Sequence, residues 1–366
     1  MPKKLGFGCM RLPSVSDGVV DIELTKKMVD VFIENGYTYF DTAWMYCNGK
    51  SEEIMKETLV MRHPRESFTL TTKLPSYMVK CEDDRDKIIN EQLRRTGAGY
   101  FDYYLIHDVN NKSIETFEKF KCFEWVKQKK AEGVVKNIGF SFHGTYDLFD
   151  RLILEHHKDL DVVQLQLNYL DWEDKDVAAR KCYELATKYG IKVLVMEPVR
   201  GGKLANVPAE VEAMFKESEP EMSAASWAIR FAAGFENIYM VLSGMSNMEQ
   251  LLDNMNTIDN FRPLTEEQYA IINKAADIIN EVAEIPCTGC SYCTVDCPAG
   301  IAIPQYFALY NKDVREGRGS ASEGYASEKA KGGAPSDCVE CGQCENMCPQ
   351  HLEIRGLLKT VKARFE

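Results

Sequence analysis

Two cysteine runs with the same spacing constrain this chain more than any other feature of its sequence. The cysteines of the two runs are Cys287, Cys290, Cys293 and Cys297, followed by Cys338, Cys341, Cys344 and Cys348. Each run has the pattern C-x2-C-x2-C-x3-C-P. Three thiolates at this spacing can surround one corner of a cubane cluster from a single loop, whereas a fourth has to come from a distant segment. The runs therefore predict metal clusters that hold the C-terminal part of the chain together.

The same spacing is found in bacterial ferredoxins, which this part of the chain resembles. In those proteins it binds 4Fe-4S clusters, and the fourth cysteine of each run binds the cluster of the other run. The resemblance implies two 4Fe-4S clusters with crossed ligation, in which Cys348 completes the first site and Cys297 completes the second. We expect a small α-helical dicluster domain, similar to a ferredoxin, over residues 285–366.

Two other uses of cysteine are weighed against the clusters. Structural zinc sites usually take their four cysteines as two separated pairs, not as three from one loop. Disulfides are disfavoured because the opening residues, MPKKLGFGCMRLP, lack a charged start followed by an apolar run, so no secretory signal is visible. We therefore expect reduced thiols and a cytoplasmic protein. The five remaining cysteines, at positions 9, 47, 81, 122 and 182, have no ligand spacing.

Charge and hydropathy argue against two classes of partner. The formal net charge is -12, from 44 basic and 56 acidic residues, which disfavours binding to nucleic acid. No apolar stretch approaches the roughly 20 residues that a membrane-spanning helix needs. We therefore expect neither a nucleic acid nor a membrane as a partner.

Residues 1–284 alternate short β-branched or aromatic runs with longer amphipathic stretches, a pattern typical of a parallel sheet wrapped by helices. The expected strands cover residues 4–9, 37–41, 68–73, 102–107, 136–141, 161–166, 192–196 and 238–243. Eight such βα units predict a TIM (β/α)8 barrel. The alternative is an open doubly wound sheet, but GFGCMR after the first strand is not the G-x-G-x-x-G turn that such a sheet uses for a dinucleotide.

The segment 317–337 joins the two cysteine runs. Its sequence, GRGSASEGYASEKAKGGAPSD, is rich in glycine, serine, alanine and charge. This composition is typical of linkers, so we expect a mobile loop.

Four polar residues lie at or just beyond the carboxyl ends of the expected strands, which is where TIM barrels carry their chemistry. They are Asp41, Tyr46, Lys73 and His107. A nearby ammonium favours the phenolate of a tyrosine, and a carboxylate can hold that ammonium in place. A histidine beside the phenol could orient a carbonyl oxygen. The four together suit protonation of an oxygen while hydride arrives at carbon. Each residue alone has a structural explanation, such as a helix cap or a satisfied core histidine.

Several motifs in roughly residues 5–260 resemble those of the aldo/keto reductases. In family order they are GFGCMRLP, FDTAWMYCNGKSEE, TTKL, YYLIH, IGFSFHG, VVQLQLNYL, VMEPVRGG and SGMSNMEQLLDN. The resemblance implies a catalytic tetrad of Asp41, Tyr46, Lys73 and His107. With its cysteine runs, the whole chain is similar to the branch of the family that carries a C-terminal two-cluster domain.

The resemblance also implies a nicotinamide cofactor site, with departures from the family pattern. Phe142 follows Ser141 where the family usually has Asn, Met196 replaces an aromatic residue, and no basic residue stands at Gly244 or Gln250. NADH is therefore expected to bind about as well as NADPH. The residues assigned to this site are Met10, Arg11, Ser141, Gln164, Met196, Gly244, Ser246, Asn247, Gln250 and Asn254.

The expected function is reduction of a carbonyl, or a related unsaturated group, of a small molecule, with Tyr46 as proton donor. Clusters move single electrons whereas this reduction needs a pair, so three arrangements stay open. The clusters could be structural beside an NAD(P)H site, could feed a flavin in the altered pocket, or could serve an electron-transfer protein. A non-catalytic redox sensor is the alternative from another functional class.

Overall fold

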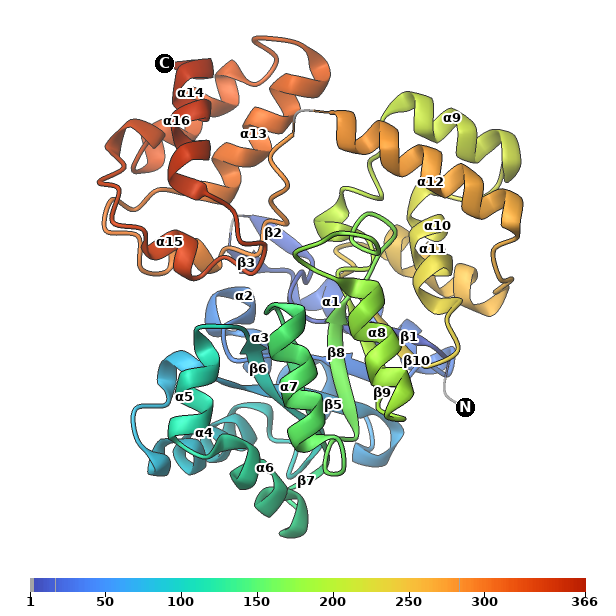
Figure 1. The fold of residues 1–366 in the computed structure, drawn as a ribbon, viewed down its shortest axis with the longest axis vertical. Coiled ribbons are helices and arrows are strands. Elements are labelled where there is room, and N and C mark those ends of the chain that lie inside the picture. The colour runs from blue at the N-terminus through green and yellow to red at the C-terminus, as the bar shows by residue number, and fades with distance from the viewer. Residues whose placement is uncertain (1–2, 17, 283) are drawn as a thin grey trace. The chain divides into compact units, whose positions relative to one another are not determined.

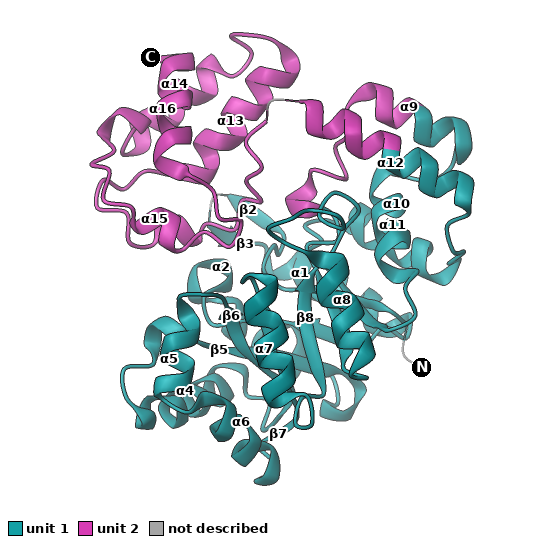
Figure 2. Ribbon diagram, in the orientation of Figure 1, with its two compact units in different colours: residues 1–199, 214–273 teal, residues 200–213, 274–366 magenta. Residues whose placement is uncertain are grey.

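The computed structural model describes residues 3–16, 18–282 and 284–366 (Figure 1). The chain forms two compact units (Figure 2). Unit 1 consists of Met1–Val199 and Met214–Asn273, and unit 2 of Arg200–Ala213 and Lys274–Glu366. Unit 1 contains all the strands of the barrel, and unit 2 contains both cysteine runs.

Unit 1 is built on a closed barrel of parallel strands in the order β1-β10-β9-β8-β7-β6-β5-β4. The strands are β1 (Leu5–Gly8), β4 (Tyr39–Asp41), β5 (Thr69–Pro75), β6 (Phe101–Val109), β7 (Val135–Phe142), β8 (Val162–Gln166), β9 (Lys192–Met196) and β10 (Ile238–Ser243). Each coincides with an expected run. The closure confirms the predicted TIM barrel and excludes the open sheet.

Helices cover the outside of the barrel (Figure 1). They are α1 (Ile22–Glu34), α3 (Ser51–Met55), α4 (Glu82–Thr96), α5 (Ser113–Lys119), α6 (Cys122–Ala131), α7 (Tyr146–His156), α8 (Ala179–Lys188), α10 (Ala224–Ala233) and α11 (Met248–Asp259). Two further helices, α9 (Ala209–Ser218) and α12 (Glu266–Glu281), have residues in both units. Helix α1 shows why such segments form helices. The Asp21 carboxylate caps its first turn by accepting from the Leu24 amide at 2.9 Å. Met28 and Phe32, one turn apart, are buried on the same face.

Large side chains fill the barrel interior. Tyr39, Tyr103, Leu105, Val162, Leu194, Met240 and Leu242 form one buried cluster. Gly139 in β7 is required by close packing, because a Cβ atom there would lie 2.1 Å from the carbonyl oxygen of Val162 in β8. The strand ends are thus supported by a filled core, which positions the residues at the carboxyl ends.

A short antiparallel hairpin was not predicted. It pairs β2 (Ser14–Ser16) with β3 (Val19–Val20) directly after β1. Its strands are too short to produce a recognisable alternation in the sequence.

Unit 2 is helical around its cysteines. Its main helices are α13 (Ile303–Glu316), α14 (Ser322–Lys331), α15 (Gln343–Asn346) and α16 (Ile354–Phe365). A buried cluster that includes Tyr306, Phe307, Leu358 and Val361 also contains Cys293. The cysteine side chains are therefore part of the core of this unit.

The expectation of a mobile loop over 317–337 is wrong. The segment contains α14 and a 3-10 turn at Pro335–Asp337. The buried Asp313 carboxylate accepts from the amides of Gly319 and Ala321, and the Tyr325 ring stacks on Phe365 with centroids 4.5 Å apart. Asp313 and Phe365 lie outside the segment, so the composition of the segment did not reveal these contacts.

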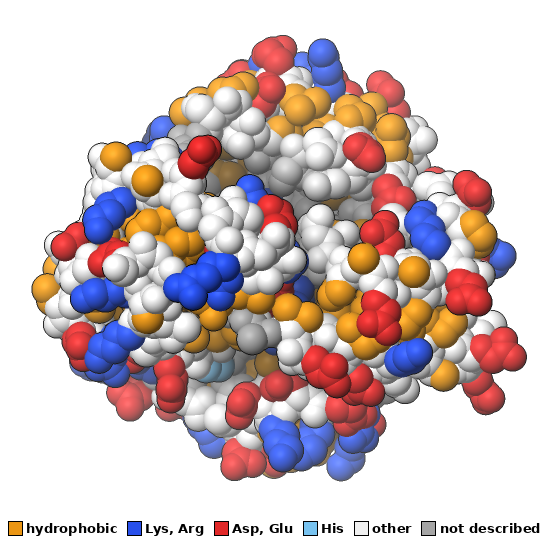
Figure 3. Space-filling model, turned by 90° about the horizontal axis from the view of Figure 1, so that it is seen from above, with side chains coloured by type: hydrophobic (Ala, Val, Ile, Leu, Met, Phe, Trp, Pro, Cys, Tyr) orange, Lys and Arg blue, Asp and Glu red, His pale blue; other side chains and the backbone are white. Residues whose placement is uncertain are grey.

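Acidic and basic side chains are interspersed on the face shown in Figure 3, in keeping with the net charge of -12. In the described part of the chain, no helix combines the length and the apolar character required to cross a bilayer.

Candidate functional site

Three neighbouring strands and one turn bring the four tetrad residues together. Asp41 ends β4, Lys73 lies in β5 and His107 in β6, while Tyr46 begins the four-residue turn α2 (Tyr46–Gly49). The Lys73 ammonium donates to the Asp41 carboxylate at 2.6 Å, to the Thr42 carbonyl oxygen at 2.9 Å and to the Tyr46 hydroxyl at 3.3 Å. The Tyr46 and His107 rings meet edge to face, with centroids 6.1 Å apart.

Burial and charge decide the protonation of this group. Lys73 is fully buried, which lowers its pKa, but Asp41 and Tyr46 more than offset this and raise the pKa of Lys73 above its usual value. Burial lowers the pKa of His107 well below its usual range, and the nearby Lys73 adds to this effect. At neutral pH the site holds a charged ammonium and a neutral imidazole.

The phenol differs from the expectation in one respect. Burial raises the pKa of Tyr46 to about 12, outweighing the opposite effect of Lys73. The expected preference for the phenolate is therefore not the net result in the resting site. Tyr46 carries its proton at neutral pH, which a proton donor requires.

The ends of β1 and β10 gather five of the residues assigned to the cofactor. The Ser246 hydroxyl donates to the Arg11 carbonyl oxygen at 2.9 Å, and the Ser246 amide donates to the Gln250 side chain at 2.7 Å. Gly244 adjoins the Arg11 side chain, since a Cβ atom at Gly244 would lie 3.2 Å from the Arg11 Cβ. The Asn247 side chain caps α11 by accepting from the Gln250 amide at 2.9 Å.

The other assigned residues lie elsewhere around the strand ends. The Gln164 amide donates to the second oxygen of Asp41 at 3.3 Å, which joins it to the tetrad. The Ser141 hydroxyl accepts from the Asp108 amide at 2.8 Å. Asn254 is buried, and its side chain donates to the Ser243 hydroxyl at 3.0 Å. Met10 and Met196 are partly exposed, beyond β1 and at the end of β9.

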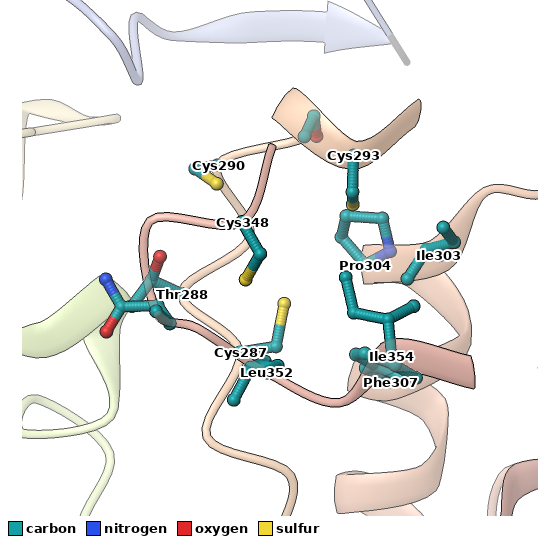
Figure 4. A pocket seen from close by; sticks show the side chains of 12 residues that line it. Cys287, Thr288, Cys290, Cys293, Ile303, Pro304, Phe307, Cys348, Leu352 and Ile354 are labelled. Atoms are coloured by element: carbon teal, nitrogen blue, oxygen red, sulfur yellow. The ribbon is translucent and has the colours of Figure 1, made fainter. Parts of the chain in front are cut away.

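Two pockets in unit 2 are lined by cysteines from both runs. The first cysteine pocket is lined by Cys287, Cys290, Cys293 and Cys348 together with apolar residues that include Ile303, Phe307 and Ile354. Figure 4 shows these four cysteines around one space, with Cys348 on a separate segment. Among the described residues, no group of three or more His, Cys, Asp or Glu side chains is arranged to hold a single metal ion.

The second cysteine pocket has a matching set of cysteines. Its cysteines are Cys297, Cys338, Cys341 and Cys344, and Arg355 also lines it. In each pocket three thiols of one run therefore meet the fourth thiol of the other run, as the crossed arrangement requires. Four thiols around one space are the set of ligands that a 4Fe-4S cluster takes.

Comparison with known proteins assigns the larger part of the chain. Residues 4–277 match the model of the aldo/keto reductase family, which is more than half of the sequence. The chain belongs to the aldo/keto reductase family. Residues 286–352 match the model of a 4Fe-4S dicluster domain. This aldo/keto reductase is thus an oxidoreductase with a C-terminal dicluster domain, as the sequence predicted.

The relatives of this aldo/keto reductase are distant. The uncharacterised oxidoreductase YqkF of Bacillus subtilis (strain 168) is 24% identical over 297 residues, which cover 72% of this chain and 90% of that protein. An aldo-keto reductase of Klebsiella pneumoniae, in complex with NADPH, superposes with a TM-score of 0.58 at 16% identity over 74% of this chain and 90% of that one. The holo form of a Bacillus halodurans aldo-keto reductase has a TM-score of 0.58 at 24% identity, over 74% and 91% of the two chains.

Two acidic residues of this aldo/keto reductase were not among the expected site residues. Glu197 follows β9 with a left-handed backbone (φ 55°), and its carboxylate lies 3.5 Å from the Arg11 guanidinium. Asp108 follows His107, also left-handed (φ 53°), and burial raises its pKa to about 6. Unusual backbone geometry at strand ends often marks functional positions. The sequence signal was an acidic residue directly after an expected site residue (His107 or Met196), which is weak on its own.

Proposed function

We propose that this enzyme reduces the carbonyl group of a small molecule, with hydride from NADP(H) and a proton from Tyr46. The observation that carries the proposal is the Lys73 ammonium, which contacts both the Asp41 carboxylate at 2.6 Å and the Tyr46 hydroxyl at 3.3 Å. An ammonium in this position stabilises the phenolate that remains when the phenol gives up its proton. The group is therefore suited to general acid catalysis.

Each residue of the tetrad has a separate task in this proposal. The Tyr46 hydroxyl donates its proton to the carbonyl oxygen of the substrate. Lys73 balances the charge left on the phenolate, and Asp41 keeps Lys73 charged and in place. The neutral His107 orients the carbonyl oxygen by donating a hydrogen bond. The nicotinamide, when bound, supplies the hydride to the carbonyl carbon.

The residues around Arg11 support a dinucleotide site. The positive end of the α11 dipole favours an anion, and Arg11, whose carbonyl oxygen accepts from Ser246 next to this end, adds a positive charge. Arg11, Ser246 and Gln250 would hold the phosphates, and Gln164 would contact the nicotinamide amide next to Asp41. Two Klebsiella pneumoniae aldo-keto reductases of this fold contain NADPH or NADP, which favours this cofactor over the flavin alternative.

We propose further that the two cysteine pockets each hold one 4Fe-4S cluster with crossed ligation. Cys293 and Cys344 belong to the buried core of unit 2, and the other pocket cysteines apart from Cys290 and Cys341 pack against that core. Clusters at these positions would join segments that are distant in sequence. Their first role in this proposal is to close the C-terminal domain, and a redox protein is the partner with which they would exchange single electrons.

The test of the catalytic proposal is Tyr46→Phe, assayed with NADPH and with benzaldehyde or methylglyoxal as probe substrates. Loss of a general acid lowers turnover by about two to four orders of magnitude. The dissociation constant of NADPH, measured by fluorescence, is expected to stay the same. Tyr183→Phe is the control, because that hydroxyl accepts from the Asn237 amide on the outside of the barrel. Unchanged turnover in Tyr46→Phe would remove the assignment.

A further inference from the structure

The turn that carries Tyr46 has an unfavourable backbone conformation. Cys47 and Asn48 are left-handed, with φ values of 52° and 54°, and Gly49 follows with φ 79°. Consecutive left-handed residues other than glycine are disfavoured by contacts of the Cβ atom. Such a conformation persists only where surrounding groups determine it. The position of the Tyr46 hydroxyl therefore depends on contacts from outside the turn.

Arg95 on α4 supplies contacts at both ends of this turn. Its guanidinium donates to the carbonyl oxygen of Gly49, directly after Tyr46 and its two left-handed neighbours. The same guanidinium lies over the Trp44 ring, 4.5 Å from the centroid, just before Tyr46. The Arg95 side chain is only 6% exposed. One buried cation thus spans the segment from Trp44 to Gly49.

Glu52 connects Arg95 to the strand of Lys73. One carboxylate oxygen lies 3.1 Å from the Arg95 guanidinium. The other accepts from the Thr72 hydroxyl at 2.7 Å and from the Gln92 side-chain amide at 2.8 Å. Glu52 has no exposed surface. Its hydrogen bonds reach the residue next to Lys73.

Gln92 completes the connection by binding the main chain of Lys73. Its amide donates to the Lys73 carbonyl oxygen at 3.0 Å, and its own oxygen accepts from the Tyr104 hydroxyl at 2.7 Å. A continuous set of buried polar contacts therefore runs from the Tyr46 turn through Arg95, Glu52 and Gln92 to Lys73. The direct Lys73–Tyr46 hydrogen bond, at 3.3 Å, is longer than the hydrogen bonds that Glu52 and Gln92 make.

We propose that Glu52, Gln92 and Arg95 are positioning residues that fix the distance between the Tyr46 hydroxyl and the Lys73 ammonium. The inference rests on the proposed role of Tyr46. A buried ion pair costs desolvation, and apolar residues of similar volume often stabilise a fold equally well. Stability alone therefore gives little reason to bury Glu52 and Arg95. The geometry of proton transfer gives a specific one.

The experiment compares Arg95→Met with Arg230→Met. Arg230 is a matched control: it is 3% exposed, donates to the Arg262 carbonyl oxygen and pairs with Glu219, all in unit 1. Both variants lose a buried cation and its hydrogen bonds. Because a misplacement of about 1 Å can cost about 100-fold in rate, Arg95→Met is expected to lower kcat for benzaldehyde about 10- to 100-fold. Arg230→Met is expected to keep kcat within about twofold of the parent, because the contacts of Arg230 do not involve the Tyr46 turn.

The Tyr46→Phe background separates this inference from the proposed function. If Arg95 acts through Tyr46, adding Arg95→Met to Tyr46→Phe produces little further loss of kcat, and the dissociation constant of NADPH does not change. Gln92→Met serves as the second variant where Arg95→Met does not fold, with the same expected loss. Equal losses in Arg95→Met and Arg230→Met, or additive losses in the Tyr46→Phe background, would overturn the positioning role. A fully active Tyr46→Phe would overturn the proposed function instead.

Discussion

At the scale of single residues, burial sets the working state of the site more than charge does. The phenol of Tyr46 lies beside an ammonium, yet burial raises its pKa to about 12. His107 loses its charge for the same reason, since burial lowers its pKa. Both groups are therefore in the protonation state that carbonyl reduction requires, without a change on binding.

This leads to a prediction for the pH dependence of the reduction. Tyr46 keeps its proton up to a pKa of about 12, and His107 stays neutral down to values well below its ordinary pKa. Turnover with saturating NADPH is therefore expected to be constant from about pH 7 to about pH 10, the range between the ordinary pKa values of the two residue types. A kcat profile that falls above pH 8 would mean that Lys73 lowers the pKa of Tyr46 after all.

Arg355 distinguishes the two cysteine pockets. It lines the second pocket, whereas the described lining of the first pocket has neutral side chains besides its cysteines. Its partner Glu345, at 2.7 Å, is outside the second pocket's described lining. A cation near a cluster favours the reduced form, which carries one more negative charge. The cluster of the second pocket should therefore have the higher reduction potential.

The prediction is that Arg355→Gln lowers the reduction potential of the second cluster and leaves that of the first cluster nearly unchanged. The measurement is a redox titration followed by electron paramagnetic resonance. Lys359→Gln is the control, because it removes a charge from the same helix and pairs with Glu340 instead of lining the pocket. Equal shifts in both variants, or in both clusters, would contradict the role of Arg355.

At the scale of elements, the fourth cysteine of each run lies in the pocket formed by the first three cysteines of the other run. The first pocket contains Cys348, and the second contains Cys297. Cys348→Ala is therefore expected to damage the cluster of the first pocket, and Cys297→Ala that of the second. Iron content and the resonance spectrum of each reduced variant check this. If Cys348→Ala instead damaged the cluster of the second run, and Cys297→Ala that of the first run, each run would bind its own cluster.

The ordered segment 317–337 gives a second prediction for an element. The Asp313 carboxylate is 1% exposed and binds the amides before α14, and it also accepts from Arg364 at 2.6 Å. Removing such a partner costs about 1–3 kcal/mol because the donors lose their acceptor. Asp313→Ala should therefore speed proteolysis within 317–337, followed by mass spectrometry. An unchanged cleavage rate would mean that other contacts hold the segment.

The parts of the fold that were predicted are those that depend on neighbouring residues in the sequence. The barrel strands alternate with amphipathic helices, and the cysteine spacing is a local pattern. Helix α14 was missed because it depends on Asp313 and Phe365, which lie outside its segment. The set of Glu52, Gln92 and Arg95 was missed for the same reason, since only the folded barrel brings these side chains to Lys73.

At the scale of the whole molecule, the two units have different sources of stability. Unit 1 has a large core of its own, which includes the filled barrel interior. Unit 2 has a smaller core that contains cysteines. Small domains of this kind couple metal binding to folding. Their response to iron removal should therefore differ.

The prediction is that anaerobic removal of iron with a chelator unfolds unit 2 and leaves the barrel folded. Hydrogen exchange followed by mass spectrometry distinguishes the two units, with protection lost in α13 and α16 and kept in α1 and α4. NADPH binding to the treated protein is the accompanying check on the barrel. Retained protection in α13 would show that the clusters do not hold this unit together.

The crossing of the cysteine runs also orders the events of biosynthesis. The first pocket lacks its fourth thiol until Cys348 has been synthesised, and the second is incomplete until Cys344 has been made. A nascent chain that has exposed only the first run can place three of its four thiols in the first pocket and one in the second, so it completes neither set of four. With the proposed crossed ligation, metal insertion would wait until Cys348 has been synthesised, by which time the barrel has had the opportunity to fold.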